Sequence, residues 1–161
     1  MKTVFKDELI WVVNSEDEII STSGYDSIKE LSEGLACVRR QSKYGYVDEN
    51  GKEIIPLIFD DAGKFIEDIT SAKLNGKLVL IDKDGILVKQ LDYDDVWDFH
   101  EGYAIVKAKN KYGFINKQGE EIISPIYDEV KNFEKEGIAY VKIDNNWFNI
   151  NKFGQKTKRR F

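Results

Sequence analysis

The chain has 161 residues, of which 42% are hydrophobic and 33% charged, and its formal net charge is −5. This length and composition are typical of a single folded domain with a sizeable core. The acidic balance disfavours nonspecific nucleic-acid binding, which depends on clustered Lys and Arg side chains. We therefore expect no nucleic-acid partner, while a basic protein partner is compatible with the charge.

A single Cys excludes an internal disulfide and indicates a reducing compartment. No run approaches 18 apolar residues, so neither a transmembrane helix nor a membrane partner is expected. Asp7 and Glu8 stand where a signal peptide would have its apolar segment. These features predict a cytoplasmic protein, although a chain whose signal peptide had been removed would look the same.

An aromatic residue followed by Asp recurs every 34 residues, at Tyr25, Phe59, Tyr93 and Tyr127. A fixed period of this size is typical of solenoids, propellers and arrays. On this period, residues 1–24 are the second half of a unit. They carry predicted strands at 4–6, 10–14 and 18–20, with a turn before the last one that is one residue shorter than in later units.

Residues 25–58 form the first complete unit, in which we predict three strands called A, B and C. Strand A lies in Gly34–Val38, where apolar residues alternate, and strand B lies in Lys43–Asp48, rich in aromatic and β-branched residues. Strand C contains Ile54 and Ile55 and ends at Pro56. Each unit is thus predicted to be a three-stranded antiparallel meander.

The next unit, 59–92, is degenerate: its strand A is assigned to 72–74, two residues late, and its strand C lacks the Glu and the Pro. Residues 93–126 repeat the full pattern. Residues 127–155 hold strands A and B, followed by polar residues at the strand C place, as a capped array requires. A basic tail, 156–161, closes the chain and is expected to be a solvated terminus.

The turns between strands B and C begin with Asp48, Asp82, Asn116 and Asn151, each followed three residues later by Gly. This is the chemistry of a type I turn whose last residue has positive φ. Residues 82–85 also suggest a calcium loop, but 116–119 has no carboxylate, so the turn explains every copy and no metal is expected. Short α- or 3₁₀-turns are expected in the connections that follow each aromatic-Asp pair, best at 94–101.

Together these units predict an all-β fold of about five tandem units of ~34 residues in an open, twisted repeat array, with a five-bladed β-propeller as the alternative. The whole chain, 1–161, is expected to be one repeat domain. Its parts are a partial unit at 1–24, units at 25–58, 59–92, 93–126 and 127–155, and the tail at 156–161.

The segment from Lys43 to Pro56, KYGYVDENGKEIIP, and its copy at 111–125 resemble the WG (KWG) repeat family of bacterial proteins. The resemblance covers 25–58 and 93–154 well and the remainder loosely. The Trp of the family is Tyr in these two copies; Trp147 holds its place in the last unit, where Phe148 replaces the Gly. The resemblance implies a β-rich tandem repeat that serves as a binding or scaffolding surface. It carries no catalytic motif.

Trp97 is the clearest departure from the repeat pattern, because its register partners are Lys29, Gly63 and Lys131. An exposed aromatic residue there suits a binding hot spot; local packing is the alternative. We therefore predict a partner-binding patch of neighbouring residues, namely Trp97, Asp98, His100, Glu101 and Tyr103.

Other candidates have structural explanations that we favour. His100 is the only His, and catalysis would need a nucleophile or a second base beside it. Cys37 shares its register with Ile105 and Tyr140, which indicates a packed side chain rather than a nucleophile. The acidic run at 92–98 suits a solvated edge better than a metal site. The strand aromatic residues suit cross-strand core pairs better than a stacking platform: Tyr44, Tyr46, Tyr112, Phe114, Tyr140, Trp147 and Phe148.

The sequence thus favours a non-enzymatic protein-interaction module that presents an acidic, aromatic-bearing face, as an adaptor or an inhibitor or immunity-like protein. A glycan- or small-ligand-binding module is the alternative. An enzyme with a site between repeats, around Asp98, His100 and Glu101, is a third and weaker reading. We predict no catalytic residue, cofactor or metal, and the oligomeric state is left open.

Overall fold

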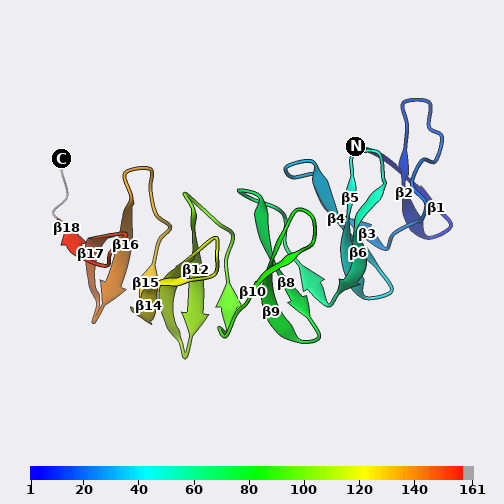
Figure 1. Ribbon diagram of the computed structural model, residues 1–161. Helices are drawn as coiled ribbons and strands as arrows, with labels where there is room; N and C mark the ends of the chain where they lie inside the picture. The colour runs from blue at the N-terminus through cyan, green and yellow to red at the C-terminus, as the bar shows by residue number, and fades with distance from the viewer. Residues whose placement is uncertain (158–161) are drawn as a thin grey trace. The chain divides into compact units, whose positions relative to one another are not determined.

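The computed structural model describes residues 1–157 (Figure 1). In these residues every regular element is a strand, and no helix could span a membrane. The strands are β1 (Lys2–Lys6), β2 (Leu9–Val13), β3 (Ser27–Ile28), β4 (Leu35–Arg40), β5 (Lys43–Asp48), β6 (Glu53–Phe59), β7 (Asp61–Ala62), β8 (Ile69–Leu74), β9 (Lys77–Asp82), β10 (Leu87–Gln90), β11 (Asp95–Val96), β12 (Tyr103–Ala108), β13 (Lys111–Asn116), β14 (Glu121–Tyr127), β15 (Glu129–Val130), β16 (Ile138–Ile143), β17 (Asn146–Asn151) and β18 (Lys156–Thr157).

The strands form one two-stranded sheet, β1-β2, and four four-stranded sheets that follow one another along the chain. Their orders are β3-β4-β5-β6, β10-β9-β8-β7, β11-β12-β13-β14 and β15-β16-β17-β18. This confirms the predicted all-β open repeat array. The chain divides into two compact units, Met1–Leu87 and the part from Val88 onwards, which are described separately below. The prediction of one domain stays a prediction.

Each complete sheet has four strands, not the three predicted, because a short strand pairs with the outer edge of strand A. In the first complete repeat, Ser27 pairs with Arg39 and Ile28 pairs with Val38. The predicted α- or 3₁₀-turns in these connections are wrong. The outward N–H and C=O groups of strand A need partners, and the short strand supplies them: the Lys29 N–H, for example, donates to the Cys37 carbonyl over 2.8 Å.

The degenerate repeat keeps the regular register, so its strand A does not begin two residues late. Ile69 pairs with Asp82 as Leu35 pairs with Asp48, and Ala72 takes the place of Val38. The sequence reading was misled because Asp68, with φ of 67°, replaces the Gly that begins this strand elsewhere. Asp tolerates this left-handed conformation better than most residues.

The first turn between strands B and C has the normal length, not one residue fewer. Asp17 adopts φ of 65° where Gly51 has 76°, and its N–H donates to the Asn14 carbonyl over 3.3 Å. Asn14 Oδ1 accepts the N–H groups of Glu16 and Glu18, both at 2.9 Å. The side chains of Asp48, Asp82, Asn116 and Asn151 accept the same two bonds, which supports the turn interpretation over a calcium loop.

At the C-terminal end, the polar residues at the strand C place form a short strand. In it Thr157 pairs with Asn149 and Lys156 pairs with Ile150. Of the predicted basic tail, residues 158–161 lie outside the described residues.

Successive sheets within a unit pack face against face. In the first unit, Tyr46 is fully buried, its ring lies 4.8 Å from that of Phe65 in the next repeat, and its hydroxyl donates to the Gly63 carbonyl over 2.7 Å. In the second unit, Phe114 packs on Phe133 at the same 4.8 Å. Burial of these large rings is the main favourable contribution to stacking one repeat on the next.

The Asp of each aromatic-Asp pair is structural. Asp60 accepts the Gly76 N–H of its own A–B turn over 2.8 Å and the Lys43 ammonium of the preceding repeat over 2.6 Å. In the second unit, Asp128 accepts in the same way from Asp144 and Lys111, at 2.9 and 2.5 Å. The hydrogen bond from the Lys side chain is the largest cause that holds the pKa of each of these two carboxyls below its usual range.

Candidate functional site

Trp97 occupies the same place in its repeat as the register partners predicted from the 34-residue period. Its N–H donates to the Ile105 carbonyl over 2.9 Å, and Lys131 makes the equivalent bond to Tyr140 over 2.8 Å. The Trp97 side chain is 40% exposed. Its ring lies 5.7 Å from the ring of Tyr112, tilted by 54°. Local packing therefore holds one side of the indole, and the rest faces solvent.

Charged side chains lie close to Trp97 in the sequence or contact the Tyr112 ring on which it packs. Asp98 and Glu101 are exposed, and Glu101 lies in a two-residue turn with φ of 53°. Lys107 places its ammonium 5.8 Å from the centre of the Tyr112 ring, within cation–π range. The patch predicted from the sequence did not include Lys107 and Tyr112. Their pairing directly opposite each other in adjacent strands is the feature that could have identified them. We call the set of Trp97, Asp98, Glu101, Lys107 and Tyr112 the Trp97 patch.

Two residues of the predicted patch, His100 and Tyr103, also contact the next repeat. His100 Nδ1 lies 3.1 Å from the Phe133 carbonyl and donates to it, because a carbonyl only accepts. Ser32, its register partner, makes the same contact with the next repeat through its hydroxyl. The ring of Tyr103 lies 4.6 Å from that of Phe133 and packs on the core. Both side chains join adjacent repeats.

Cys37 is a packed side chain. It is 3% exposed, and its thiol donates weakly to the Ala62 carbonyl over 3.6 Å. Burial, the largest cause, raises the pKa of this thiol to about 11, so the nucleophilic thiolate is scarce at neutral pH. Within residues 1–157, no group of three or more His, Cys, Asp or Glu side chains is arranged to hold a metal ion.

The strand aromatic residues are mostly core, as the sequence favoured. Tyr46 and Phe114 are fully buried. Tyr140 differs: it is 40% exposed and stacks on Trp147 at 4.9 Å and 19°. The Lys131 ammonium lies 5.9 Å from the centres of both rings. This pair is the part of the aromatic set that comes nearest to a stacking platform, the alternative that the sequence disfavoured.

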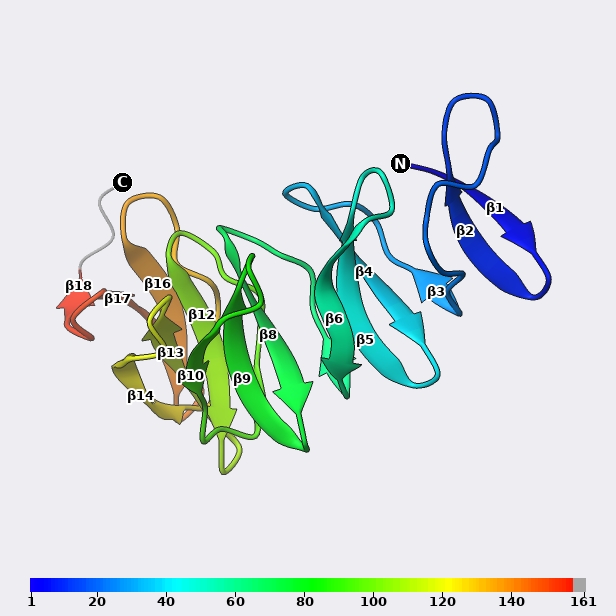
Figure 2. The same ribbon diagram turned by 45° about the vertical axis from the view of Figure 1, so that its right-hand side comes forward.

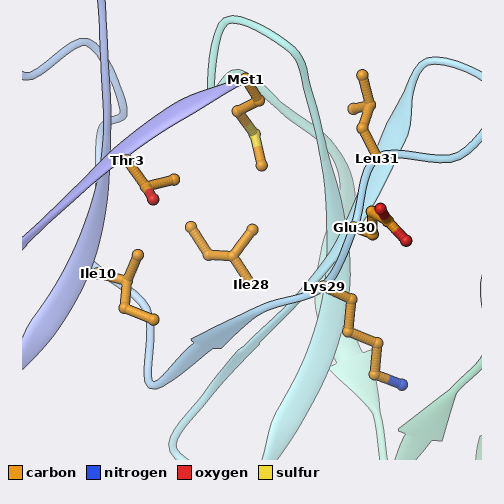
Figure 3. A pocket seen from close by; sticks show the side chains of 7 residues that line it. All are labelled: Met1, Thr3, Ile10, Ile28, Lys29, Glu30 and Leu31. Atoms are coloured by element: carbon orange, nitrogen blue, oxygen red, sulfur yellow. The ribbon is translucent and has the colours of Figure 1, made fainter.

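The first unit contains a cleft of about 490 Å³ that sequence reasoning did not anticipate. Figure 3 shows Ile28 pointing toward the side chains of Thr3 and Ile10, with Met1 above them. Its lining residues are Met1, Thr3, Ile10, Ile28, Lys29, Glu30 and Leu31.

Comparisons with known proteins agree with the repeat. The family profile described as "WG containing repeat" matches four consecutive stretches, residues 12–44, 44–77, 80–112 and 112–147. A comparison with curated proteins gives no match.

Among solved structures, the chain is similar to PorZ, described as an essential bacterial surface component of the type-IX secretion system of Porphyromonas gingivalis. The TM-score is 0.50 at 13% identity, and the match covers 92% of this chain but 23% of the PorZ chain. The present chain thus spans about a quarter of that protein, and the likeness concerns the fold alone.

Proposed function

Because the chain belongs to the family of WG-containing repeat proteins, we propose that it is a non-enzymatic interaction module that binds a protein partner, as an adaptor or an inhibitor. The observation that carries the proposal is the exposure of Trp97. At the same register position the other complete repeats have Lys29, Gly63 and Lys131, so the repeat fold does not require an aromatic residue there.

The Trp97 patch has the features of a binding hot spot. Large aromatic residues with restricted motion contribute much of the binding energy at protein interfaces. Contact with Tyr112 holds the indole on one side, so little conformational freedom is lost when a partner covers the other side. The exposed carboxylates of Asp98 and Glu101 favour a partner with a basic rim.

Three observations support a role without catalysis. The His100 ring nitrogen and the Cys37 thiol both contact backbone carbonyls of the next repeat, and the raised thiol pKa disfavours nucleophilic chemistry. A cytoplasmic location for this module stays a prediction.

The test is affinity capture from the native host, followed by binding measurements with the purified captured protein. Wild type is compared with Trp97→Ala and, as the matched control, with Lys131→Ala at the same register position of the next repeat. We expect Trp97→Ala to weaken binding by about 30-fold, the loss typical of a hot-spot residue, and Lys131→Ala to change it less than threefold.

Equal affinities of the two variants would remove the Trp97 patch from the interface. If wild type captures no protein, a glycan panel becomes the next measurement. Tyr140→Ala is then the informative variant, because the exposed Tyr140–Trp147 pair is the feature that favours the glycan alternative.

A further inference from the structure

Strand C is the outer strand of each complete sheet, and in the first unit it exposes apolar side chains. β6 is the last strand of the order β3-β4-β5-β6, as Figure 2 shows, and its Ile54 and Ile58 are 37% and 48% exposed. The corresponding segments of the repeats before and after expose four more aliphatic side chains, between 40% and 62%. We call the whole set the strand C face: Ile19, Ile20, Ile54, Ile58, Ile86 and Leu87.

Contacts between repeats make this face continuous. A Cβ atom on Gly51 would lie 2.9 Å from the Cβ of Ser21, and one on Gly85 would lie 3.0 Å from Cγ2 of Ile55. The turn before strand C in each repeat therefore packs on strand C of the repeat before it. The strand C face directly adjoins these contacts in the sequence, at Ile20, Ile54 and Ile86. A contiguous apolar surface with a polar border marks an interaction site.

The border of the strand C face is acidic. Four exposed carboxylates lie in the turns before strand C or at its start: Glu16, Glu49, Glu53 and Asp84. None of the ion pairs within residues 1–157 involves these four groups. The same segments contain two lysines, of which Lys83 is already paired with Asp68 at 3.4 Å and Lys52 is exposed. The face therefore favours a partner that brings positive charge.

The edge of β6, at the middle of the face, is poorly suited to backbone pairing with another strand. Pro56 has no N–H, and the pairing of β6 with β5 shifts register twice. Prolines and bulges of this kind keep an edge strand from accepting a further strand. A partner is therefore expected to bind through side chains.

The spacing of the repeats suits an α-helix that runs along the array. Stacked sheets lie about 10 Å apart, and seven residues of an α-helix, two turns, advance about 10.5 Å. Apolar residues at seven-residue intervals can therefore meet one strand C after another. An extended strand repeats its side chains about every 6.6 Å on one face, which does not match. Polyproline segments are bound by aromatic grooves, whereas this face is aliphatic.

We propose that the strand C face of the first unit binds a basic amphipathic helix of a partner protein. The apolar stripe of the helix packs on the exposed isoleucines, and the Lys or Arg side chains beside the stripe pair with the carboxylates of the border. A second copy of this chain does not fit, because it would bring the same acidic border and like charges would meet. The face shares no residue with the Trp97 patch, so it adds a second surface to the proposed interaction module.

The test is a calorimetric titration of the full chain with the end-blocked peptide LKKLLKKLKKLLKKL, in which Leu follows the helical pattern. One control peptide has Glu in place of every Lys, and the other has the same composition with Lys and Leu alternating as in a strand. We expect one-to-one binding of the first peptide and binding of both controls that is weaker by roughly tenfold or more. Because every regular element in the described part of the chain is a strand, a helical circular dichroism signal that grows on mixing reports the bound helix.

Variants of the chain locate the binding. Ile58→Ser should weaken binding of the helical peptide about fivefold, since a half-exposed Ile no longer contributes apolar area. The matched control is Ile126→Ser in β14, at the register position of Ile58 and 54% exposed, which should change the affinity less than about twofold. Glu53→Gln removes only charge and should weaken binding about threefold, a difference that added salt abolishes.

Thermal melts establish that the three variants fold. Absence of binding, equal binding of either control peptide, or equal losses in Ile58→Ser and Ile126→Ser would overturn the proposal. So would self-association of the wild type, seen by sedimentation and abolished by Ile58→Ser. If the helical peptide does not bind while Trp97-dependent capture of a protein persists, this inference is wrong and the proposed function stands.

Discussion

Strand B of a complete repeat and strand B of the last repeat differ at four of six positions, among them the one where Gly113 of β13 corresponds to Phe148 of β17. A Cβ atom on Gly113 would lie 2.3 Å from the Ile123 carbonyl oxygen, and one on Gly45 would lie 2.6 Å from that of Ile55. In the last repeat, the ring of Phe148 packs toward Tyr127 at 6.2 Å instead.

The difference lies in strand C. β14 runs over seven residues, Glu121–Tyr127, and its register shifts as it passes Gly113. β18 has two residues, Lys156–Thr157, and pairs only with Asn149 and Ile150. Gly113 has no positive φ, so the repeat needs glycine here for close backbone approach and not for its conformational freedom. Where strand C is short, a large side chain fits.

The largest expected effect on stability comes from disrupting the close backbone contact between β13 and β14 at Gly113. Gly113→Ala forces β14 away from β13 and is expected to lower the free energy of unfolding by about 1–3 kcal/mol. Urea denaturation followed by tryptophan fluorescence measures the change. Gly45→Ala is the matched variant in the first unit and should behave alike. Wild-type stability in both variants would contradict the close-approach explanation.

A smaller effect is expected at the ring that joins two repeats. Tyr46→Phe keeps the packing on Phe65 but removes the hydrogen bond to the Gly63 carbonyl. It should lower the unfolding free energy by about 1 kcal/mol. The second unit already has Phe114 at this place, so Phe114→Tyr is the reciprocal variant. A thermal melt in which Tyr46→Phe matches wild type would show that the hydroxyl contributes nothing.

The smallest effect is expected from the carboxylates that connect repeats. The pKa of Asp128 is lowered in the folded chain, first by the Lys111 side chain and then by the Asp144 N–H. Its contribution is therefore present above the unfolded pKa of about 3.9 and is lost as the pH falls through the lower folded value. Asp128→Asn should flatten the acid side of the stability profile, and added salt should weaken the difference. If wild type and Asp128→Asn lose stability identically at acid pH, the stabilising role of the Asp128 carboxylate is contradicted.

The sequence predicted strands A, B and C well, because their alternation and aromatic content extend over several residues. The short strands were missed because two residues, such as Asp95–Val96, carry no detectable period. Backbone hydrogen bonds to strand A define them instead. The register of the degenerate repeat was not predicted because Ala72 was aligned two positions away from Val38, its true counterpart. The 34-residue step from Leu35 to Ile69 gives the correct alignment.

The partner-binding patch stays a prediction, but the exposure of Trp97 could be predicted. The period placed Trp97 at an exposed register, and the structure leaves 40% of its side chain exposed. His100 and Tyr103 were grouped with it because they also differ from the first repeat. Their counterparts in the first repeat have structural contacts: Ser32 donates a hydrogen bond to the next repeat, and Leu35 is buried. Comparison of the repeats could therefore have indicated similar contacts for His100 and Tyr103.

The aspartates that connect repeats also bear on how such a chain changes length. Asp60 and Asp128 each lie 17 residues after the Lys partner. The turn N–H that the aspartate accepts lies 16 residues later at these two and 15 residues later at Asp26 and Asp94. A duplication or deletion of 34 residues returns every aspartate to an equivalent pair of donors. A change of any other size in the 17-residue spacing separates an aspartate from its Lys partner, whereas the spacing to the turn varies by one residue with its bond kept. Recombination is therefore expected to lengthen or shorten the array in whole periods, with smaller insertions confined to segments outside the spans from Lys to Asp.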